Sequence, residues 1–495
     1  MQNLYSIIKA NTPKFGDRVL IKYRKDNKVI EKTYSDLFND SNKLINYFTQ
    51  ENIKNKKIAI ISENSYEFFV CFIAGISTNN ILIPLDNRLP EDKLDYLIKT
   101  SETSILLYSN NIKGLVDKLN TQVQKYCMQD LLLVDASTEL PNVDSNPDDV
   151  CLIMYTSGST GESKGVMLSQ NNFIINTKAI IETANMPERY SELSVLPMFH
   201  IYALSLDVIW PLLYGNTIVL SSGMSSILSE LKEFNIYHIC VVPMLAEYIC
   251  NALLLELKKN PACSRQEIKN KVVGDVLKRF AIGGAYINTE LRKELQSFGI
   301  DAYVGYGMTE CVVVATDEGV RIKKGSVGQV LPCNTIKIID DEICIKGQNV
   351  MKGYYNNPEA TAEVLIDGYL HSGDIGYLDI NNYLYIIGKK KNLIITSNGE
   401  NVSPEELEKQ LLEFEGIKEL IVYQKNDIIA LEVFPDMKYF NGKDQKEILK
   451  YFSEKVRLLN NKNPGYKHIK EVSLRDTEFE KTSTMKIKRE NYYYK

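Results

Sequence analysis

The sequence predicts an α/β protein. A large N-terminal domain of parallel α/β sheets, with a β-rich subdomain, precedes a small α+β C-terminal domain. Strand-like apolar runs alternate with helical segments over most of the chain, a rhythm typical of parallel sheets covered by helices. Between about residues 325 and 388 the pattern changes to short runs separated by Gly and Asn turns. Beyond residue 392 the chain has helices and strands of its own.

The first parallel sheet is predicted from an apolar strand at residues 57–61. An amphipathic helix follows at 65–76, then a strand at 81–85, a helix at 91–99 and a strand at 105–108. Strands that alternate with helices in this order need crossover connections, so we expect them to run parallel.

A second series of the same kind lies between residues 191 and about 306, with strands at 239–243 and 279–282. The β-rich subdomain follows over about 325–388, where 343–347 is a typical strand. We therefore predict one N-terminal domain over residues 1–388.

The basic cluster at residues 389–392 is interpreted as a domain boundary, although three lysines in a row could equally form a solvated loop. The C-terminal domain would cover residues 393–495. Its predicted elements are helices at 404–414 and 445–459 and strands at 420–423 and 428–434.

Composition excludes several classes of protein. With 495 residues, the chain is too long for a single core and should form about two to four domains or subdomains. A net charge of −5 argues against a dedicated nucleic-acid binder, and four histidines argue against a multi-histidine metal centre. The nine cysteines are scattered without a C-x-x-C pair, which indicates buried reduced thiols rather than disulfides or a zinc site.

The sequence predicts neither a secretory signal nor a membrane span. The first residues show no basic region followed by an apolar core, so a secretory signal is not expected. The most apolar stretch, residues 68–85, is interrupted by polar residues 77–80, which argues against membrane insertion. We expect a cytoplasmic protein.

The most informative segment is residues 155–165, Y-T-S-G-S-T-G-E-S-K-G, which lies between two apolar strands. Its hydroxyls, its glycine backbone and Lys164 suit phosphate oxygens. The Walker pattern G-x-x-x-x-G-K-[ST] does not match, because the order here is G-x-x-G-x-x-K-G. A solvated Gly/Ser linker is the alternative, but linkers seldom separate two buried strands. The segment therefore predicts a nucleotide-triphosphate loop of a non-Walker type.

Three further segments give weaker signals. Residues 306–310 offer a ring, a hydroxyl and a carboxylate, which could stack a base, hold a phosphate and bind Mg²⁺; a buried tyrosine and a surface glutamate would also explain them. Asp374 could grip a ribose diol, although Ser-Gly-Asp is a common turn. The basic run at 481–489 could equally be a charged tail.

In this order and at these spacings, the four segments resemble those of adenylate-forming enzymes. That superfamily comprises acyl-CoA synthetases, adenylation domains of peptide synthetases and luciferases. The resemblance covers nearly the whole chain, from Thr33 to Arg489. Further matching segments are residues 83–86, 196–200, 283–285, 346–355 and 399–408.

The resemblance implies a role for each matched position. Thr309 would contact the α-phosphate, Glu310 would bind Mg²⁺ and Asp374 would hold the ribose hydroxyls. Lys486 matches the lysine that bridges the substrate carboxylate and the α-phosphate, where a cation between two anions stabilises the transition state. His200 is grouped with these catalytic residues. The residues that would hold the β- and γ-phosphates of ATP are Thr156, Ser157, Gly158, Ser159, Thr160, Gly161 and Lys164. Those that would line the rest of the nucleotide are Gly283, Gly284, Ala285, Tyr306, Gly307 and Met308.

Three positions depart from the family pattern. Lys389, another expected nucleotide contact, replaces an arginine after Gly388 and so loses a bidentate fork. Met485 replaces a glycine before the catalytic lysine, a difference that some fatty acyl-CoA synthetases share. Lys391 aligns with the hinge residue, which implies that residues 389–392 form a hinge and that the C-terminal domain is a mobile lid.

The resemblance implies an AMP-forming acid–thiol ligase. Such an enzyme activates a carboxylic acid as acyl-AMP, releases pyrophosphate and transfers the acyl group to a pantetheine thiol, here expected to be that of CoA. A fatty or other apolar acid is expected, because Met308 and residues 312–314 are apolar. His200 stands where amino-acid-activating relatives place an aspartate, so a substrate ammonium would lack its partner. His200 could instead be an ordinary core imidazole.

Other functions stay open at this point. An acyl-carrier-protein ligase would share every motif, because a carrier protein presents the same pantetheine thiol. Amino-acid or aryl-acid adenylation and a non-catalytic adenylate-binding module are less favoured. The expected cofactors are ATP, Mg²⁺ and CoA or carrier-protein phosphopantetheine.

Overall fold

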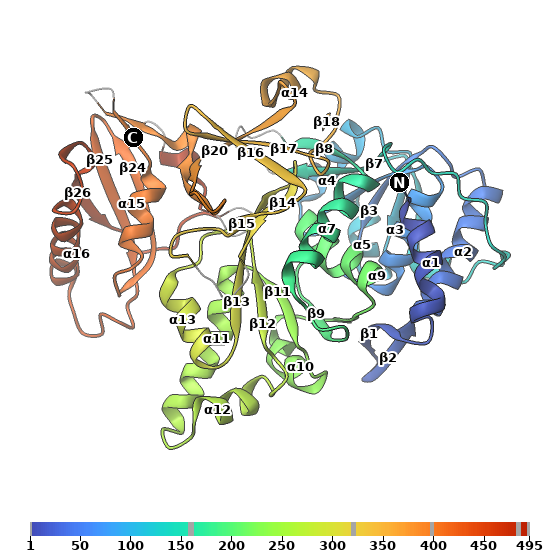
Figure 1. The fold of residues 1–495 in the computed structure, drawn as a ribbon, viewed down its shortest axis with the longest axis horizontal. Coiled ribbons are helices and arrows are strands. Elements are labelled where there is room, and N and C mark those ends of the chain that lie inside the picture. The colour runs from blue at the N-terminus through green and yellow to red at the C-terminus, as the bar shows by residue number, and fades with distance from the viewer. Residues whose placement is uncertain (1, 157–162, 318–322, 397–399, 482–486, 493–495) are drawn as a thin grey trace.

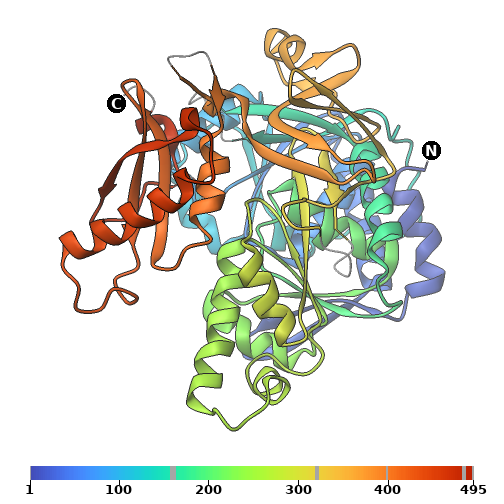
Figure 2. The same cartoon turned by 60° about the vertical axis from the view of Figure 1, so that its left-hand side comes forward.

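The computed structural model describes residues 2–156, 163–317, 323–396, 400–481 and 487–492. It confirms an α/β protein with large parallel sheets in the N-terminal part and a smaller C-terminal domain (Figure 1). A second view shows the C-terminal elements to one side of the N-terminal ones (Figure 2).

The first sheet has the strand order β18-β8-β7-β4-β3-β5-β6. Strands β4, β3 and β5 run parallel, as predicted, and β7 and β6 extend the parallel part on either side. The β7–β8 pair is antiparallel, since the connection between these strands is too short for a helical crossover. The β8–β18 pair is antiparallel as well. The strands are β3 (Lys57–Ile61), β4 (Ile81–Leu85), β5 (Ile105–Tyr108), β6 (Gln124–Cys127), β7 (Val150–Thr156), β8 (Lys164–Ser169) and β18 (Gly353–Tyr354).

The second sheet has the order β15-β14-β13-β12-β11-β9-β10-β1-β2. Its middle strands, from β13 to β1, are parallel, and antiparallel pairs close both edges. The N-terminal strand β1 lies between β2 and β10. The strands are β1 (Val19–Lys25), β2 (Lys28–Thr33), β9 (Ser191–Ser194), β10 (Thr217–Leu220), β11 (His238–Val241), β12 (Arg279–Ile282), β13 (Asp301–Met308), β14 (Val312–Thr316) and β15 (Gln329–Val330).

Helices surround both sheets, and α3 is the most deeply buried of them. Its phenylalanines at 68, 69 and 72 are at most 3% exposed. They belong to one core that also contains Ile58 of β3 and Ile21 of β1, so the two sheets share a hydrophobic interior. The helices of this region are α1 (Leu4–Phe15), α2 (Tyr34–Gln50), α3 (Tyr66–Ser77), α4 (Glu91–Thr100), α5 (Lys113–Val116), α6 (Met128–Leu131), α7 (Gln170–Ala184), α8 (Ile201–Ala203), α9 (Trp210–Tyr214), α10 (Ile227–Glu233), α11 (Pro243–Lys259), α12 (Arg265–Val272), α13 (Thr289–Ser297) and α14 (Pro358–Val364). Short 3₁₀ helices are η1 (Asn110–Ile112) and η3 (Met224–Ser226), and η2 (Leu204–Ile209) is a π-helix.

A third, antiparallel sheet lies within the segment predicted to be β-rich. It lies between the N-terminal sheets and the C-terminal elements (Figure 1). Its strands are β16 (Asn334–Ile339), β17 (Glu342–Gly347), β19 (Leu365–Ile366), β20 (Tyr369–Leu378) and β21 (Leu384–Lys389).

The C-terminal elements have a separate core that includes Leu407, Phe440 and Phe452. The predicted helices and strands are present, and β26, which was not predicted, pairs parallel with β25. The elements are η4 (Lys390–Asn392), β22 (Ile394–Ile395), β23 (Asn401–Val402), α15 (Pro404–Leu411), β24 (Ile417–Lys425), β25 (Ile428–Pro435), α16 (Gln445–Asn460), η5 (Gly465–Lys467), β26 (Ile469–Leu474) and η6 (Arg489–Tyr492).

The nine cysteines are free thiols, as predicted. Cys263 is exposed and Cys333 half-buried, and the other cysteine side chains are buried. Among the described residues, no helix combines the length and apolar character needed to cross a membrane.

Candidate functional site

The predicted nucleotide loop connects the ends of β7 and β8. Thr156 and Lys164 are partners across this hairpin, with Thr156 Oγ1 3.4 Å from the Lys164 carbonyl oxygen. Lys164 Nζ lies 5.0 Å from the ring centroid of Tyr354 on the neighbouring strand β18. The remaining predicted phosphate contacts lie outside the described residues: Ser157, Gly158, Ser159, Thr160 and Gly161.

The turn between β13 and β14 requires a glycine at position 307. A bulge falls between Tyr306 and Gly307, and a Cβ on Gly307 would lie 1.8 Å from the Val312 carbonyl oxygen. Val312 itself has a φ of 59°, a left-handed conformation that is rare for a β-branched residue. Strain of this kind gathers at functional sites. The turn leaves Thr309 half-buried and Glu310 buried.

Glu310 is joined to strand β18. The Tyr354 hydroxyl donates a hydrogen bond of 2.9 Å to Glu310 Oε1. Burial raises the pKa of Glu310, because it disfavours the charged carboxylate. Tyr354 and the positive charges of Lys389 and Lys164 act in the opposite direction. The site therefore holds a carboxyl group that a further cation would stabilise in its ionised form.

Three predicted nucleotide contacts from distant segments meet at Asp374. Asp374 on β20 is the strand partner of Lys389 on β21. Lys389 Nζ donates to Asp374 Oδ1 at 2.6 Å, and the Tyr306 hydroxyl donates to Oδ2 at 2.7 Å. The carboxylate of Asp374 is thus oriented from both sides, and we refer to this trio as the Asp374 array.

A second ion pair lies beside the predicted hinge. Lys390 Nζ is 2.9 Å from Glu342 Oε2, and the Gly373 N–H donates to Glu342 Oε1 at 2.8 Å. Burial alone would raise the pKa of Glu342, but Lys390, the Gly373 N–H and His371 together hold it below its ordinary value. Lys391, the predicted hinge residue, is exposed and follows Lys390 in η4.

Gly283, Gly284 and Ala285 follow the carboxyl end of β12. Gly283 is buried against Tyr202 of α8, where an added Cβ would lie 3.1 Å from the phenol ring. Gly284 has a φ of 84°, which favours glycine, and it is exposed together with Ala285. The predicted nucleotide wall is therefore backed by an aromatic side chain.

His200 precedes α8 and packs beside Phe199, with ring centroids 4.6 Å apart and ring planes tilted by 50°. The guanidinium of Arg88 lies 5.3 Å from the Phe199 ring and pairs with Asp86, Nε to Oδ1, at 2.8 Å. Burial lowers the pKa of His200 and so favours the neutral imidazole, although Asp86 opposes this. The matching segments 83–86 and 196–200 therefore meet in space.

The predicted catalytic lysine, Lys486, lies outside the described residues, as does Met485. The residues on either side of that segment, Lys481 and Ile487, form an isolated antiparallel bridge. Arg489 pairs with Glu408 of α15.

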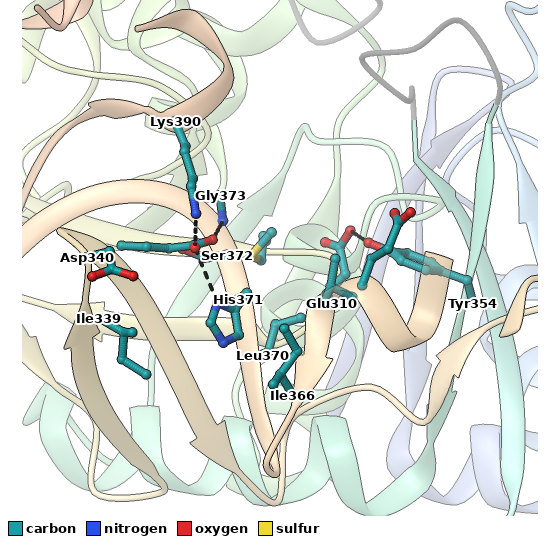
Figure 3. A pocket seen from close by; sticks show the side chains of 14 residues that line it. Glu310, Ile339, Asp340, Tyr354, Ile366, Leu370, His371, Ser372, Gly373 and Lys390 are labelled. Carbon is teal, nitrogen blue, oxygen red and sulfur yellow. Dashed lines mark hydrogen bonds and ion pairs between the residues drawn. The ribbon is translucent and has the colours of Figure 1, made fainter. Parts of the chain in front are cut away.

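A cavity of about 440 Å³ opens beside Glu310. Glu310 and Tyr354 lie at one end, and Lys390 and His371 at the other (Figure 3). Met308 also lines it, whereas Asp374 does not. The cavity therefore connects the candidate metal ligand with the hinge ion pair.

Sequence reasoning missed several residues of this region. Tyr354 belongs to a matching segment, but its contact with Glu310 depends on the β8–β18 pairing. The Glu342–Lys390 pair depends on the registers of β17, β20 and β21. Asn64, after β3, accepts a 3.0 Å hydrogen bond from the Met198 N–H and donates one of 2.7 Å to the Leu196 carbonyl, which fixes the segment before His200. No periodic signal marks such contacts.

A family model described as AMP-binding enzyme matches residues 8–355, and a second, AMP-binding enzyme C-terminal domain, matches residues 391–495. The chain belongs to the AMP-binding enzyme family. Together the two matches cover most of the chain.

Named relatives of this AMP-binding enzyme include acid–CoA ligases. It is 29% identical over 410 residues to a feruloyl-CoA synthase of Amycolatopsis, covering 78% of this chain and 79% of that protein. It is 34% identical over 346 residues to 4-coumarate–CoA ligase 1 of Narcissus pseudonarcissus, covering 64% and 61%. It is 26% identical over 422 residues to a long-chain-fatty-acid–CoA ligase of Mycobacterium tuberculosis, covering 79% and 80%.

Solved structures share the fold of this AMP-binding enzyme. O-succinylbenzoate coenzyme A synthetase of Bacillus subtilis, in complex with ATP and magnesium, aligns with a TM-score of 0.82 at 23% identity, covering 99% of each chain. ATP-bound MatB of Rhodopseudomonas palustris aligns with a TM-score of 0.83 at 22% identity, covering 99% of this chain and 98% of that one.

Proposed function

We propose that the protein activates a carboxylic acid with ATP as an acyl-adenylate, releases pyrophosphate and transfers the acyl group to the thiol of CoA. The observation that carries this proposal is the Asp374 array beside Glu310: a polar carboxylate held by Tyr306 and Lys389, next to a buried carboxyl group. The named relatives, which are CoA ligases, support the same reaction.

Asp374 would accept hydrogen bonds from the ribose hydroxyls, since Lys389 and Tyr306 hold its carboxyl group in place from both sides. Tyr306 and the segment from Gly283 would border the nucleotide. Thr309 would donate to the α-phosphate, and Thr156 and Lys164 would contact the outer phosphates.

Glu310 fits a magnesium ligand. It offers a carboxylate oxygen, the ligand type that Mg²⁺ prefers, and burial raises its pKa, so a bound cation would favour its ionised form. Tyr354 would orient it from Oε1. When bound, Mg²⁺ would neutralise charge on the phosphates of ATP.

Lys486 would lie between the substrate carboxylate and the α-phosphate during the first half-reaction. We assign it to a lid formed by residues 393–495, joined at 389–392 to the N-terminal domain, residues 1–388. The lid would turn about Lys391 after adenylation, so that pantetheine reaches the acyl-adenylate.

For the acid, we propose a carboxylate with an apolar acyl group, of the fatty type. Met308 lines the cavity beside Glu310, and the neutral imidazole favoured at His200 offers no negative charge to a substrate ammonium. An aromatic acid is the second candidate, because the feruloyl- and 4-coumarate-CoA ligases are among its relatives.

A two-stage assay tests the proposal. Acid-dependent pyrophosphate release from ATP, measured over a panel of fatty, hydroxycinnamic and amino acids, identifies the acid. CoA and acyl carrier protein are then compared as acceptors of the activated acyl group. We expect release with apolar acids and thioester with CoA. If no acid in the panel stimulates pyrophosphate release, the protein binds adenylates without turnover and the proposal is wrong.

A further inference from the structure

The second sheet places three metal-ligating side chains on one face. His238 and Cys240 are two residues apart on β11, so they point to the same side of the sheet. Glu192 on β9 is the direct strand partner of His238. Ile239, Val241 and Leu193 alternate with these residues and pack into a separate apolar core on the opposite face.

The π-helix η2 contributes a further carboxyl group to this cluster. Asp207 is fully buried and interacts with both Glu192 and Cys240. Its Oδ2 accepts a 2.7 Å hydrogen bond from Ser194, whereas Oδ1 is buried without a hydrogen-bond partner. Single π-turns inside helices often occur at functional sites, and the position of Asp207 in one supports a functional role for this cluster.

Two of the distances between the donor atoms are close to those between ligands of one ion, and the third, between His238 and Cys240, is within 4.8 Å. Cys240 Sγ is 3.2 Å from Glu192 Oε1, and His238 Nδ1 is 3.3 Å from Glu192 Oε2. Yet His238 Nδ1 makes no aligned hydrogen bond. In a tetrahedral zinc site with bonds near 2.0–2.3 Å, neighbouring ligand atoms lie about 3.3–3.8 Å apart. Glu192, His238 and Cys240 each offer one such atom, all within 4.8 Å of one another.

Among the described residues, no lysine or arginine neutralises the carboxyl groups of this cluster. Glu192 is 1% exposed and Asp207 is 0% exposed, and within the described ranges neither forms an ion pair with a lysine or arginine. Arg279 of β12 is the strand partner of His238 and its charge acts on that imidazole, but its guanidinium donates to the Ala184 carbonyl and to the Tyr303 hydroxyl and pairs with neither carboxyl group. Buried carboxylates without a partner are costly, so either protons or a metal ion must compensate them.

In the other cluster of this kind in the described chain, the carboxyl group already has a lysine partner. Glu342, Cys344 and His371 also lie within ligand distance of one another, but Lys390 already neutralises Glu342 at 2.9 Å. We therefore attach no metal to that group.

We propose that Glu192, His238 and Cys240 bind one zinc ion in the core of the N-terminal domain, with Asp207 bordering its fourth position. A thiolate, an imidazole and a carboxylate together are ligands that suit zinc. The spacing of the cysteines did not indicate this site, because its ligands come from two adjacent strands and not from a short motif.

The zinc cluster touches the candidate active site through Tyr202. The Tyr202 hydroxyl interacts with Cys240, and its ring lies against Gly283 at the predicted nucleotide wall. A metal at Cys240 would therefore hold Tyr202 in place from behind. This makes the ion a positioning element and not a participant in the chemistry.

Metal content of the full-length protein tests the proposal. The chain is produced with added zinc, desalted and analysed for zinc per chain, and a parallel sample is loaded with Co²⁺. We expect one zinc per chain and a thiolate-to-cobalt charge-transfer absorption band. Both should be lost in Cys240→Ala and in the near-isosteric Glu192→Gln. Asp207→Asn should weaken zinc binding by about 10- to 100-fold, as expected for a group outside the ligand set.

Cys250→Ala is the matched control, because Cys250 is equally buried but lies in α11 within the opposite core. It should keep both the zinc and the cobalt band. If wild type holds no more zinc than Glu192→Gln and gives no cobalt band, the cluster is compensated by protons and the proposal is overturned. Should Cys240→Ala fail to fold, Glu192→Gln and the wild-type cobalt spectrum decide the matter, since the band requires thiolate ligation.

Discussion

At the scale of single residues, the candidate site is organised by contacts between side chains far apart in the sequence. Tyr306, Asp374 and Lys389 form one hydrogen-bonded array, and Glu310 and Tyr354 form a neighbouring pair. Both carboxyl groups, Asp374 and Glu310, are buried, so the side chains that contact them fix their orientation. Substitutions here should act on the chemistry more than on the fold.

Glu310→Gln should lower the rate of Mg²⁺-dependent adenylation by roughly 100-fold, a typical cost of removing one preorganised electrostatic contact. The amide keeps the shape of the side chain but carries no charge for the ion. The measurement is pyrophosphate release titrated with Mg²⁺. Tyr354→Phe removes only the orienting hydrogen bond and should have a smaller effect. A wild-type Mg²⁺ titration in Glu310→Gln would rule out Glu310 as the ligand.

Gly307→Ala should destabilise the protein by at least about 2 kcal/mol, because the new methyl group would collide with backbone in a closed turn. Gly305→Ala is the matched control: two residues away on β13, its Cβ would lie 3.9 Å from the nearest atom, the Ala315 carbonyl oxygen. Denaturant unfolding of both variants measures the difference. Equal stability of the two would contradict the steric account of the turn.

At the scale of helices and strands, patterns that local sequence determines were predicted well. The strands at Lys57–Ile61, Ile81–Leu85 and Ile105–Tyr108 have their predicted bounds, because buried parallel strands are continuous apolar runs bordered by turns. The β26 strand was missed because half-buried residues give it a weak apolar signal. The antiparallel edges and the Glu310–Tyr354 and Glu342–Lys390 contacts depend on strand register, which periodicity does not encode.

The Glu342–Lys390 ion pair, beside the predicted hinge, should contribute to stability in a pH-dependent way. Because the folded-state pKa of Glu342 lies below its ordinary value of 4.5, its contribution to stability is present above that value. It is lost as the pH falls through the lower folded-state pKa. Glu342→Gln should therefore be less stable than wild type near neutrality, and the difference should shrink in acid. Unfolding free energies measured against pH check this.

The same variant should release Lys390 and increase amide hydrogen exchange in η4. Glu363→Gln is the control. Glu363 lines the same cavity, and among the described residues no lysine or arginine forms an ion pair with it. Unchanged exchange in Glu342→Gln would show that the ion pair does not restrain the hinge.

At the scale of the whole molecule, the N-terminal and C-terminal parts of the chain have separate hydrophobic cores. The N-terminal sheets share a core, and the C-terminal elements have another. The described contacts between them include polar ones, such as Lys324 with Glu413 at 3.5 Å and Lys409 over the Tyr286 ring at 5.5 Å. Polar interfaces of this kind allow domains to move relative to each other.

Lys486→Ala should abolish acyl-adenylate formation while ATP binding survives. Without the lysine, two anions would have to approach each other uncompensated. Acid-dependent pyrophosphate exchange measures the reaction, and calorimetry measures ATP binding. Adenylation within a few-fold of wild type would remove Lys486 from the mechanism.

Lys391→Pro should retain adenylation and lose thioester formation. Proline fixes φ near −65° and disfavours the helical region for Lys390, so the turn of the lid would be blocked. Single-turnover measurements of each half-reaction separate the two effects. Equal loss of both would point to misfolding, and an unchanged thioester rate would exclude Lys391 as the hinge.

The position of β1 has a consequence for how the chain is made. This strand begins at Val19, whereas its parallel partner β10 begins only at Thr217, so β1 leaves the ribosome well before β10. At about 5–20 residues per second, β1 waits roughly 10–40 seconds for that partner. During this time β2 can protect one edge, while the other presents unpaired backbone groups to any neighbouring chain. Slowing translation before residue 217 should therefore increase aggregation of the nascent protein, and chaperones that bind early should matter most for β1.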